Sequence, residues 1–361
     1  MNKKTIVAMS GGVDSSVAAL ILNRQGYDCI GVTMKLFSND DIGVCQKNTC
    51  CSLDDVEDAR NIAYKLGMKY YVFNFSSKFE ETVINKFIHS YENGMTPNPC
   101  IDCNRYLKFD KLFQRAKELD YNFIATGHYA QIEYSESRKR WILKKAVDCD
   151  KDQSYVLYSL TQDQLEHTLF PLGKMTKTEV RDIAQKDGFV NAQKHDSQDI
   201  CFVKDKNYAD FIENYTGKSY LPGNFVDVDG NVLGTHKGII HYTVGQRKGL
   251  GLSLKQPMYV CKVDPVNNTV VLTAHEGIYT KKLVAKDINL IATDNLFQKT
   301  RLKAKVRYRQ KEQWATVIQT DSDTIEVEFD EPQRAITKGQ AVVLYDEDIV
   351  VGGGTICETC D

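Results

Sequence analysis

The sequence contains no apolar run that approaches the roughly 20 residues needed to span a membrane. It has no internal repeat, no low-complexity segment, and no basic leader followed by an apolar core and a cleavage site. These absences predict a cytoplasmic protein without a membrane partner. The charges nearly cancel, and a net charge of −2 neither requires nor excludes a nucleic-acid partner.

The length and the cysteine content are more informative. A chain of 361 residues exceeds what one hydrophobic core usually serves, so we expect two or three domains. Eleven cysteines in a reducing compartment are better explained as thiols, metal ligands or catalytic groups than as structural disulfides.

A glycine-containing turn lies between the first expected strand and the first expected helix. Residues 10–15 read S-G-G-V-D-S, after the apolar run Ile6–Met9 and before Ser16 and the apolar residues 17–22. Glycines allow backbone amides to approach an anion closely, and the helix N-terminus adds unpaired N–H groups. The turn lacks the lysine of a Walker A loop and resembles the pyrophosphate-binding loop of the PP-loop ATPases, which cleave ATP between the α and β phosphates. The alternative is an ordinary helix cap.

The pattern of expected elements predicts the fold class. The first part alternates strands with helices such as residues 54–66, which indicates a parallel sheet that binds ligands at the carboxyl ends of its strands. Short alternating runs separated by Gly, Asp and Asn turns dominate the rest. We therefore expect an α/β parallel-sheet domain over 1–205, a small β-rich domain over 206–282 and a C-terminal β-barrel over 283–361.

Three cysteines stand out. Cys100 and Cys103 form a C-x-x-C after two prolines, and Cys201 lies in D-S-Q-D-I-C-F. Such thiols can form a redox pair or hold a metal or cluster. A structural zinc is an alternative, and its second pair of ligands would come from Cys45, Cys50, Cys51, Cys357 or Cys360. Cys29 and Cys261 fall in expected strands, which predicts buried core positions.

Residues 301–309 read R-L-K-A-K-V-R-Y-R. As one β-strand, this stretch would put five cations on the same face, which suits a phosphate backbone. The alternative is a solvated outer face of a barrel.

Several segments together resemble the family of tRNA-specific 2-thiouridylases over nearly the whole chain. The segments are S-G-G-V-D-S-S-V, T-P-N-P-x-x-x-C-N, A-T-G-H-Y, K-D-Q-S-Y, D-S-x-x-I-C-F, Y-T-V-G-Q-R-K-G-L-G, V-R-Y-R-Q and G-G-G at 352–354.

The resemblance implies a role for particular residues, ATP with Mg²⁺ as cofactor, and two macromolecular partners, tRNA and a persulfide-donating sulfur carrier protein. Cys103 would be the nucleophile and Cys201 the persulfide carrier. The ATP site would comprise Ala8, Met9, Ser10, Gly11, Gly12, Val13, Asp14, Ser15, Met34 and Gly127. The target base would face Asn98, Pro99 and Cys100. The residues touching tRNA would be His128, Lys151, Asp152, Gln153, Arg307, Tyr308 and Gln340.

One position departs from the common family pattern, because many members have Asp where this chain has Cys100. Three thiolates, Cys100, Cys103 and Cys201, could instead hold a [4Fe–4S] cluster that delivers sulfur. Two other functions compete with thiolation. One is a PP-loop synthetase or amidotransferase acting on a small substrate, which leaves Cys103 and Cys201 unexplained. The other is an RNA-binding module with a zinc knot, which leaves the phosphate loop unexplained.

Overall fold

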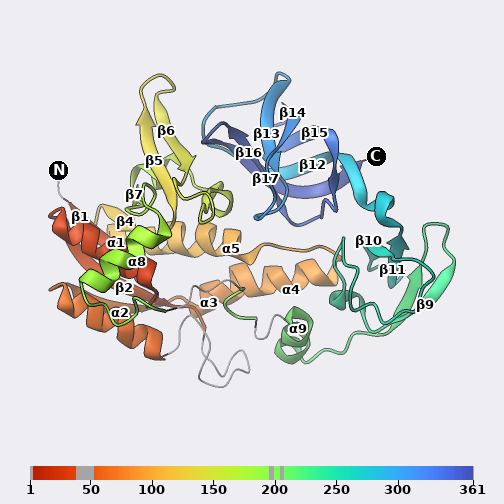
Figure 1. Cartoon of the computed structure of the whole chain (residues 1–361), viewed down its shortest axis with the longest axis horizontal. Coiled ribbons are helices and arrows are strands. Elements are labelled where there is room, and N and C mark those ends of the chain that lie inside the picture. Colours follow the sequence, from red (N-terminus) through yellow and green to blue (C-terminus); the bar gives the residue numbers. More distant parts are fainter. Residues whose placement is uncertain (1–2, 38–52, 195–198, 204–206, 361) are drawn as a thin grey trace. The chain divides into compact units, whose positions relative to one another are not determined.

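The computed structural model describes residues 3–37, 53–194, 199–203 and 207–360. The chain divides into two compact units, each built from separate stretches of sequence (Figure 1). The first unit comprises Met1–Val83, Cys100–Lys206 and Asp348–Val350, and the second Ile84–Pro99, Asn207–Glu347 and Val351–Asp361. Within the described ranges, no helix combines the length and the apolar character needed to traverse a bilayer.

A five-stranded sheet forms the centre of the first unit. Its strands are β1 (Lys4–Ala8), β2 (Asp28–Lys35), β3 (Lys69–Asn74), β4 (Phe123–Ala125) and β7 (Thr168–Leu169). The order is β3-β2-β1-β4-β7, and every neighbouring pair is parallel. Ile6 and Val7 of the central strand have no exposed surface, which explains why β1 is a continuous apolar run. The predicted parallel α/β domain is confirmed.

Helices α1 (Val13–Arg24), α2 (Leu53–Lys65) and α8 (Lys177–Lys186) share an apolar core with this sheet. Acidic residues begin α2 and Lys65 ends it, as the helix dipole favours, so the expected helix over 54–66 is confirmed within one residue. A capping box formed by Thr176 and Glu179 begins α8.

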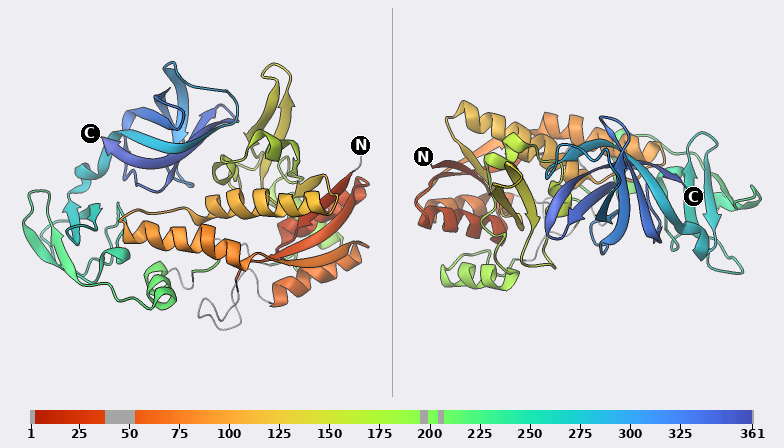
Figure 2. Two further views of the ribbon diagram at one scale, coloured as in Figure 1. Left: turned by 180° about the vertical axis from the view of Figure 1, so that it is seen from behind. Right: turned by 90° about the horizontal axis from the view of Figure 1, so that it is seen from above.

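The remaining elements of the first unit continue the helical layer or form a hairpin. They are α3 (Ser76–Phe79), α5 (Pro99–Asp102), a π-helical segment (Cys103–Lys111), α6 (Leu112–Glu118), β5 (Ala130–Ser135), β6 (Arg140–Lys145), a 3₁₀ turn (Ser154–Leu157) and α7 (Gln162–Glu166). A further π-helical segment (Glu80–Ile84) leads from α3 to α4. Helix α6 packs against β4, and Figure 2 shows this helix and α8 on different sides of the sheet.

The second unit contains a small sheet and two helices. The elements are α4 (Asn85–Glu92), α9 (Tyr208–Thr216), β8 (Gly223–Val226), β9 (Val232–His236), β10 (Tyr259–Asp264) and β11 (Thr269–Thr273), with 3₁₀ turns at Ile239–His241 and His275–Ile278. The strand order is β10-β11-β8-β9. Tyr91 of α4 stacks on Tyr208 of α9, with ring centroids 4.3 Å apart.

A closed β-barrel completes the second unit. Its strands are β12 (Tyr279–Leu290), β13 (Thr300–Lys305), β14 (Gln313–Gln319), β15 (Thr324–Arg334), β16 (Ala341–Asp346) and β17 (Ile349–Cys360). The order β12-β15-β14-β13-β16-β17 closes because β17 also pairs with β12. Alternate residues such as Ala315, Val317 and Val327 fill the interior. The predicted β-rich middle and C-terminal barrel are confirmed.

The expected strand over 301–309 is wrong at its end. Strand β13 stops at Lys305, and residues 306–312 connect it to the antiparallel strand β14. A hairpin must reverse the chain, so the cations after Lys305 leave the row. One cation of the row is also neutralised by a residue of β15, because the Arg301 guanidinium donates two 2.7 Å hydrogen bonds to the Asp330 carboxylate.

Candidate active site

The turn of residues 10–15 wraps around the N-terminus of α1. The Ser15 hydroxyl donates to the Gly12 carbonyl at 3.0 Å and accepts from the Ser10 N–H at 3.2 Å. Ser16 Oγ donates to the same carbonyl at 2.9 Å. These bonds hold the loop in shape through its own serines at a helix end whose first amides have no helical partner. An anion such as a phosphate fits that environment.

At two positions around this loop, another stretch of backbone lies so close that only glycine fits. Gly11 has φ +75°, and a Cβ there would lie 2.3 Å from the Asp55 carbonyl oxygen. A Cβ on Gly127, which follows β4, would lie 2.7 Å from Asp14 C and from Ser15 N. The expectation that residues 10–15 and 127–128 meet at the carboxyl edge of the sheet is therefore confirmed.

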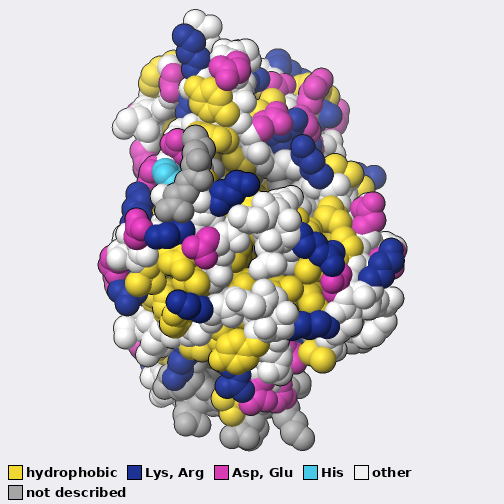
Figure 3. All heavy atoms as spheres, turned by 90° about the vertical axis from the view of Figure 1, so that its left-hand side faces the viewer, with side chains coloured by type: hydrophobic (Ala, Val, Ile, Leu, Met, Phe, Trp, Pro, Cys, Tyr) yellow, Lys and Arg dark blue, Asp and Glu magenta, His cyan; other side chains and the backbone are white. Residues whose placement is uncertain are grey.

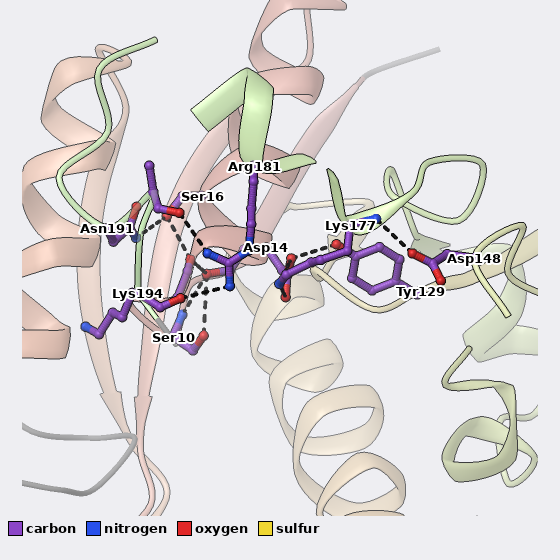
Figure 4. A network of polar contacts seen from close by, with 12 residues as sticks. Ser10, Asp14, Ser16, Tyr129, Asp148, Lys177, Arg181, Asn191 and Lys194 are labelled. Atoms are coloured by element: carbon purple, nitrogen blue, oxygen red, sulfur yellow. Dashed lines mark hydrogen bonds and ion pairs between the residues drawn. The ribbon is translucent and has the colours of Figure 1, made fainter. Parts of the chain in front are cut away.

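A partly buried ion pair ties the loop to α8 (Figure 4). Both carboxylate oxygens of Asp14 lie 2.7 Å from Lys177 Nζ, and the Tyr129 hydroxyl donates to Asp14 at 2.8 Å. The Lys177 amide in turn donates to Asp148 at 2.8 Å. The Asp14 carboxylate is thus held by protein donors, which makes it a support of the loop.

A second set of contacts supports the loop from residues 181–194 (Figure 4). Asn191 Nδ2 donates to the Gly11 carbonyl at 2.9 Å and to Ser16 Oγ at 3.0 Å. Arg181 donates to the carbonyls of Ala192 and Lys194. Lys194 pairs with two carboxylates of α2, Asp55 at 2.6 Å and Asp58 at 2.7 Å.

Sequence reasoning missed Lys177, Arg181 and Asn191 as part of this site. The sequence T-K-T-E at 176–179 is typical of a capping box and could have indicated the start of this helix, but nothing in it indicates that Lys177 pairs with Asp14. Asn191 lies 180 positions from Gly11. No local sequence signal links residues so far apart.

The Asp14–Lys177 pair should contribute to stability. The side chain of Lys177 is 11% exposed, so Asp14→Ala leaves a largely desolvated ammonium without this carboxylate. We expect a loss of about 2 kcal/mol, reduced from the value for a fully buried pair because Asp14 is 31% exposed. Urea unfolding measures it. The matched control is Glu81→Ala, which removes an exposed carboxylate 3.1 Å from Lys78 and should change stability little. Equal effects of both variants would contradict this assignment.

His128 lies inside the first unit. Its Nδ1 is 2.7 Å from Thr126 Oγ1, and Lys108 Nζ is 3.5 Å from Nε2. The Lys108 ammonium can only donate a hydrogen bond, so His128 Nε2 is the acceptor and His128 Nδ1 carries the ring hydrogen. The rings of Phe109 and Phe170 lie against the imidazole. Burial lowers the pKa of His128 well below its usual value, and the Lys108 charge lowers it further.

The lowered pKa of His128 predicts a loss of stability in acid. Below about pH 6.5 the unfolded chain takes up a proton that the folded protein excludes, so stability falls by up to about 1.4 kcal/mol per pH unit. Urea midpoints between pH 8 and pH 5.5 measure this slope. Burial also lowers the pKa of His236 and His241, so the share of His128 is the difference between the wild type and His128→Gln. An unchanged slope in that variant would contradict the assignment.

The expected tRNA residues 151–153 are engaged within the first unit. Asp152 accepts from the amides of Ala146 at 3.0 Å and Ser154 at 3.2 Å, and from the Ser154 hydroxyl. Gln153 exchanges two bonds with the Tyr129 backbone. All three residues of this stretch, Lys151, Asp152 and Gln153, are half-buried. Gln153 thereby holds the backbone of Tyr129, whose hydroxyl in turn donates to Asp14.

Cys103 and Cys201 belong to the same unit as the loop. Cys103 starts the π-helical segment that packs against α3, and Phe202 packs edge-on against Phe79 of α3 at 5.6 Å. Both thiols are half-buried and Cys100 is exposed. The π-helical segment that begins at Cys103 and the residue that follows Cys201 therefore both contact the short helix α3, which follows β3.

The described residues give no support to the metal hypotheses. Among the described residues, no group of three or more His, Cys, Asp or Glu side chains could hold a metal ion. The [4Fe–4S] cluster on Cys100, Cys103 and Cys201 and the structural zinc thus gain no support. Cys45, Cys50, Cys51 and the residues 196–198 before Cys201 lie outside the described residues.

The other cysteines are structural or peripheral. Cys29 is buried in β2, as predicted, and its burial raises the pKa of the thiol to about 12. The predicted core position of Cys261 is wrong, because this residue is only half-buried and lies at the register shift between Val260 and Lys262, where the pairing of β10 with β11 is irregular. Cys357 on β17 is half-buried and donates to the Val284 carbonyl of β12.

Met34 and Gln340, two further residues expected at the site, lie outside the loop. Met34 is half-buried near the carboxyl end of β2. In the second unit, Gln340 donates to the carbonyls of Thr96 at 2.9 Å and Pro97 at 3.1 Å, which braces the chain before Asn98 and Pro99.

Arg307 and Tyr308 occupy the connection between β13 and β14. The Arg307 guanidinium donates to the carbonyls of Val244 and Ala335 and to Thr337 Oγ1. Tyr308 is 36% exposed.

The parallel sheet, the glycine loop at the N-terminus of α1 and the edge where Gly127 meets it define a nucleotide-binding α/β domain of the HUP type. A family model described as tRNA methyl transferase HUP domain matches residues 3–205. Models described as tRNA methyl transferase PRC-barrel domain and aminomethyltransferase beta-barrel domain match 209–274 and 280–356.

Curated relatives match almost the whole chain. The tRNA-specific 2-thiouridylase MnmA of Clostridioides difficile (strain 630) is 54% identical over 99% of this chain and 98% of its own length. The enzyme of the same name from Acetivibrio thermocellus is 53% identical over 98% of this chain and 99% of its length. The protein belongs to the tRNA-specific 2-thiouridylase MnmA family.

Proposed function

We propose that this protein uses ATP to replace the C2 oxygen of the wobble uridine of tRNA with sulfur. The full-length match to tRNA-specific 2-thiouridylases carries the proposal. Its geometry is suitable, because the anion-binding loop and both candidate thiols, Cys103 and Cys201, belong to one compact unit. A side chain at Gly11 would collide with the backbone of Asp55, and one at Gly127 with the backbone of the loop itself, so glycine is needed at both positions for this packing.

In the proposed reaction, loop 10–15 binds the phosphates of ATP with its Mg²⁺, while Met34 and Gly127 line the nucleoside part. The uridine C2 oxygen attacks the α-phosphorus and diphosphate leaves. Adenylation is needed because a carbonyl oxygen is a poor leaving group, whereas AMP leaves readily.

Sulfur then moves through two thiols. Cys201 receives a persulfide from a sulfur carrier protein, and the terminal sulfur attacks C2, which expels AMP together with the former carbonyl oxygen. The Cys103 thiolate attacks the Cys201 sulfur, the S–S bond to the base breaks, and 2-thiouridine is released. The two cysteines end as a disulfide, which a thiol reductant must reopen. Bringing their Cα atoms within about 7 Å is a condition of this step.

We assign the tRNA contacts to residues on several elements. Asn98, Pro99 and Cys100 would meet the target base, and His128, Lys151–Gln153, Arg307–Tyr308 and Gln340 would bind or order the parts that touch tRNA. For His128, Asp152 and Gln153, their internal hydrogen bonds favour an ordering role over direct contact. A cytoplasmic location follows from this substrate.

Mass spectrometry of tRNA nucleosides tests the function. Incubation with ATP, a persulfide donor and unmodified tRNA should convert the wobble uridine to 2-thiouridine. An ATP–diphosphate exchange assay separates the competing functions, because a small-substrate synthetase would exchange without tRNA and a pure RNA-binding module would not exchange at all. Exchange that needs tRNA, together with thiolation, supports the proposal. Exchange without any thiolated product would overturn it.

A further inference from the structure

An exposed tryptophan lies among cations on the outer face of the barrel. Trp314 on β14 is 50% exposed, because side chains alternate along the strand and Ala315 and Val317 point into the barrel. Lys303 lies directly opposite it on β13. The Lys303 ammonium is 5.4 Å from the indole centroid, and the Arg301 guanidinium is 5.6 Å away.

The hairpin that carries this tryptophan is strongly basic. Residues 300–314 hold the cations Arg301, Lys303, Lys305, Arg307, Arg309 and Lys311 but only one acid, Glu312. By contrast, the side of the molecule seen in Figure 3 shows Lys and Arg scattered among Asp and Glu. The neighbouring strand β15 is acidic on its outer face, and its Asp330 engages Arg301 at 2.7 Å. A polyanion is therefore drawn to the β13 side of Trp314 and repelled from the β15 side.

The geometry points to Trp314 as a stacking platform for an unpaired nucleobase of the tRNA substrate, with Lys303 and the basic connection 306–312 beside the flanking phosphates. An aromatic ring among cations suits this ligand, since every base has a π-face and every nucleotide a negative charge. The inference deepens the proposed function, because it takes tRNA as the substrate.

Intrinsic fluorescence tests the platform directly, because the chain has only two tryptophans. Trp141 lies on β6, packed against Tyr134, so Trp141→Phe leaves Trp314 as the single reporter. Unmodified tRNA should quench this reporter with saturation. Heparin, a polyanion without bases, should bind the same cations without that quenching. The matched control is Trp314→Phe, whose remaining Trp141 should respond to neither polyanion.

Affinity measurements separate stacking from charge. Trp314→Ala should weaken tRNA binding about tenfold without changing its dependence on salt, while Trp314→Phe should bind within about threefold of the wild type. Lys303→Gln should lower the slope of log affinity against log salt by about 0.7 to 0.9. Because Trp314 is exposed, circular dichroism should show all these variants folded.

Unquenched fluorescence at saturating tRNA, or wild-type affinity in Trp314→Ala, would overturn the platform and leave this surface to a protein partner. Thiolation assayed at saturating tRNA keeps the two proposals distinct. Quenching without thiolation would refute the enzyme function alone, and thiolation with a silent Trp314 would refute the platform alone.

Discussion

Cys201→Ser is expected to lower the rate of tRNA thiolation by more than about a thousandfold, the scale seen when a covalent nucleophile is removed. A serine hydroxyl cannot hold a persulfide, so no sulfur reaches the base. The variant should still catalyse tRNA-dependent ATP–diphosphate exchange, because adenylation precedes sulfur transfer. Cys103→Ser should also lose multiple turnover, but its Cys201 should still accept labelled sulfur from the donor. Nucleoside mass spectrometry, exchange and protein mass spectrometry measure the three steps.

Matched variants of other thiols make this experiment specific. Cys149→Ser replaces an exposed cysteine without an assigned role and should retain wild-type activity. Cys100→Ser divides the mechanisms, because a cluster route needs its thiolate and a persulfide route does not. Retained thiolation in Cys201→Ser would refute the proposed relay.

Gly11→Ala is expected to destabilise the protein by about 3 kcal/mol and to weaken ATP binding more than tenfold. Part of the cost is a left-handed conformation at φ +75°, about 1–2 kcal/mol for a residue with a Cβ. The rest comes from the Asp55 carbonyl oxygen, which would lie 2.3 Å from the new carbon. Backbone on both sides must shift, and the loop moves with it. Urea unfolding and equilibrium dialysis with ATP measure the two effects.

Gly26→Ala isolates the conformational part of that cost. Gly26 has φ +77° after α1, and nothing lies within 4 Å of a Cβ placed there. This variant should lose only the conformational cost of about 1–2 kcal/mol and bind ATP as the wild type does. If Gly11→Ala were no worse than Gly26→Ala, close packing of α2 against the loop would not control the site.

Much of the first unit was predictable because its signals are local. The run before Ser10 is apolar without alternation, which indicates a strand buried on both faces, and the glycines mark the turn to a helix. The acids that begin α2 and the Lys65 that ends it also act within one turn of the helix dipole. These effects depend on residues a few positions apart, so the sequence alone is enough to predict the strand, the turn and the helix.

The error in the basic segment has the same origin. Period-two alternation from Arg301 continues to Arg309, but it does not reveal where the chain must reverse. The strand ends at Lys305 because its partner β14 begins at Gln313. Likewise, the bond from Arg301 to Asp330 arises only once β14 and β15 lie side by side.

Strand and helix identity, the loop at residues 10–15 and the family resemblance were thus present in the order of the residues, since propensity, glycine freedom and helix capping act locally. Folding alone decided the support of the loop. Asp14 meets Lys177 across 163 positions, and Asn191 reaches Gly11 across 180. Packing of α8 against α1 creates the first of these contacts, and the chain that follows α8 supplies the second. A local sequence pattern cannot encode a contact between residues so far apart.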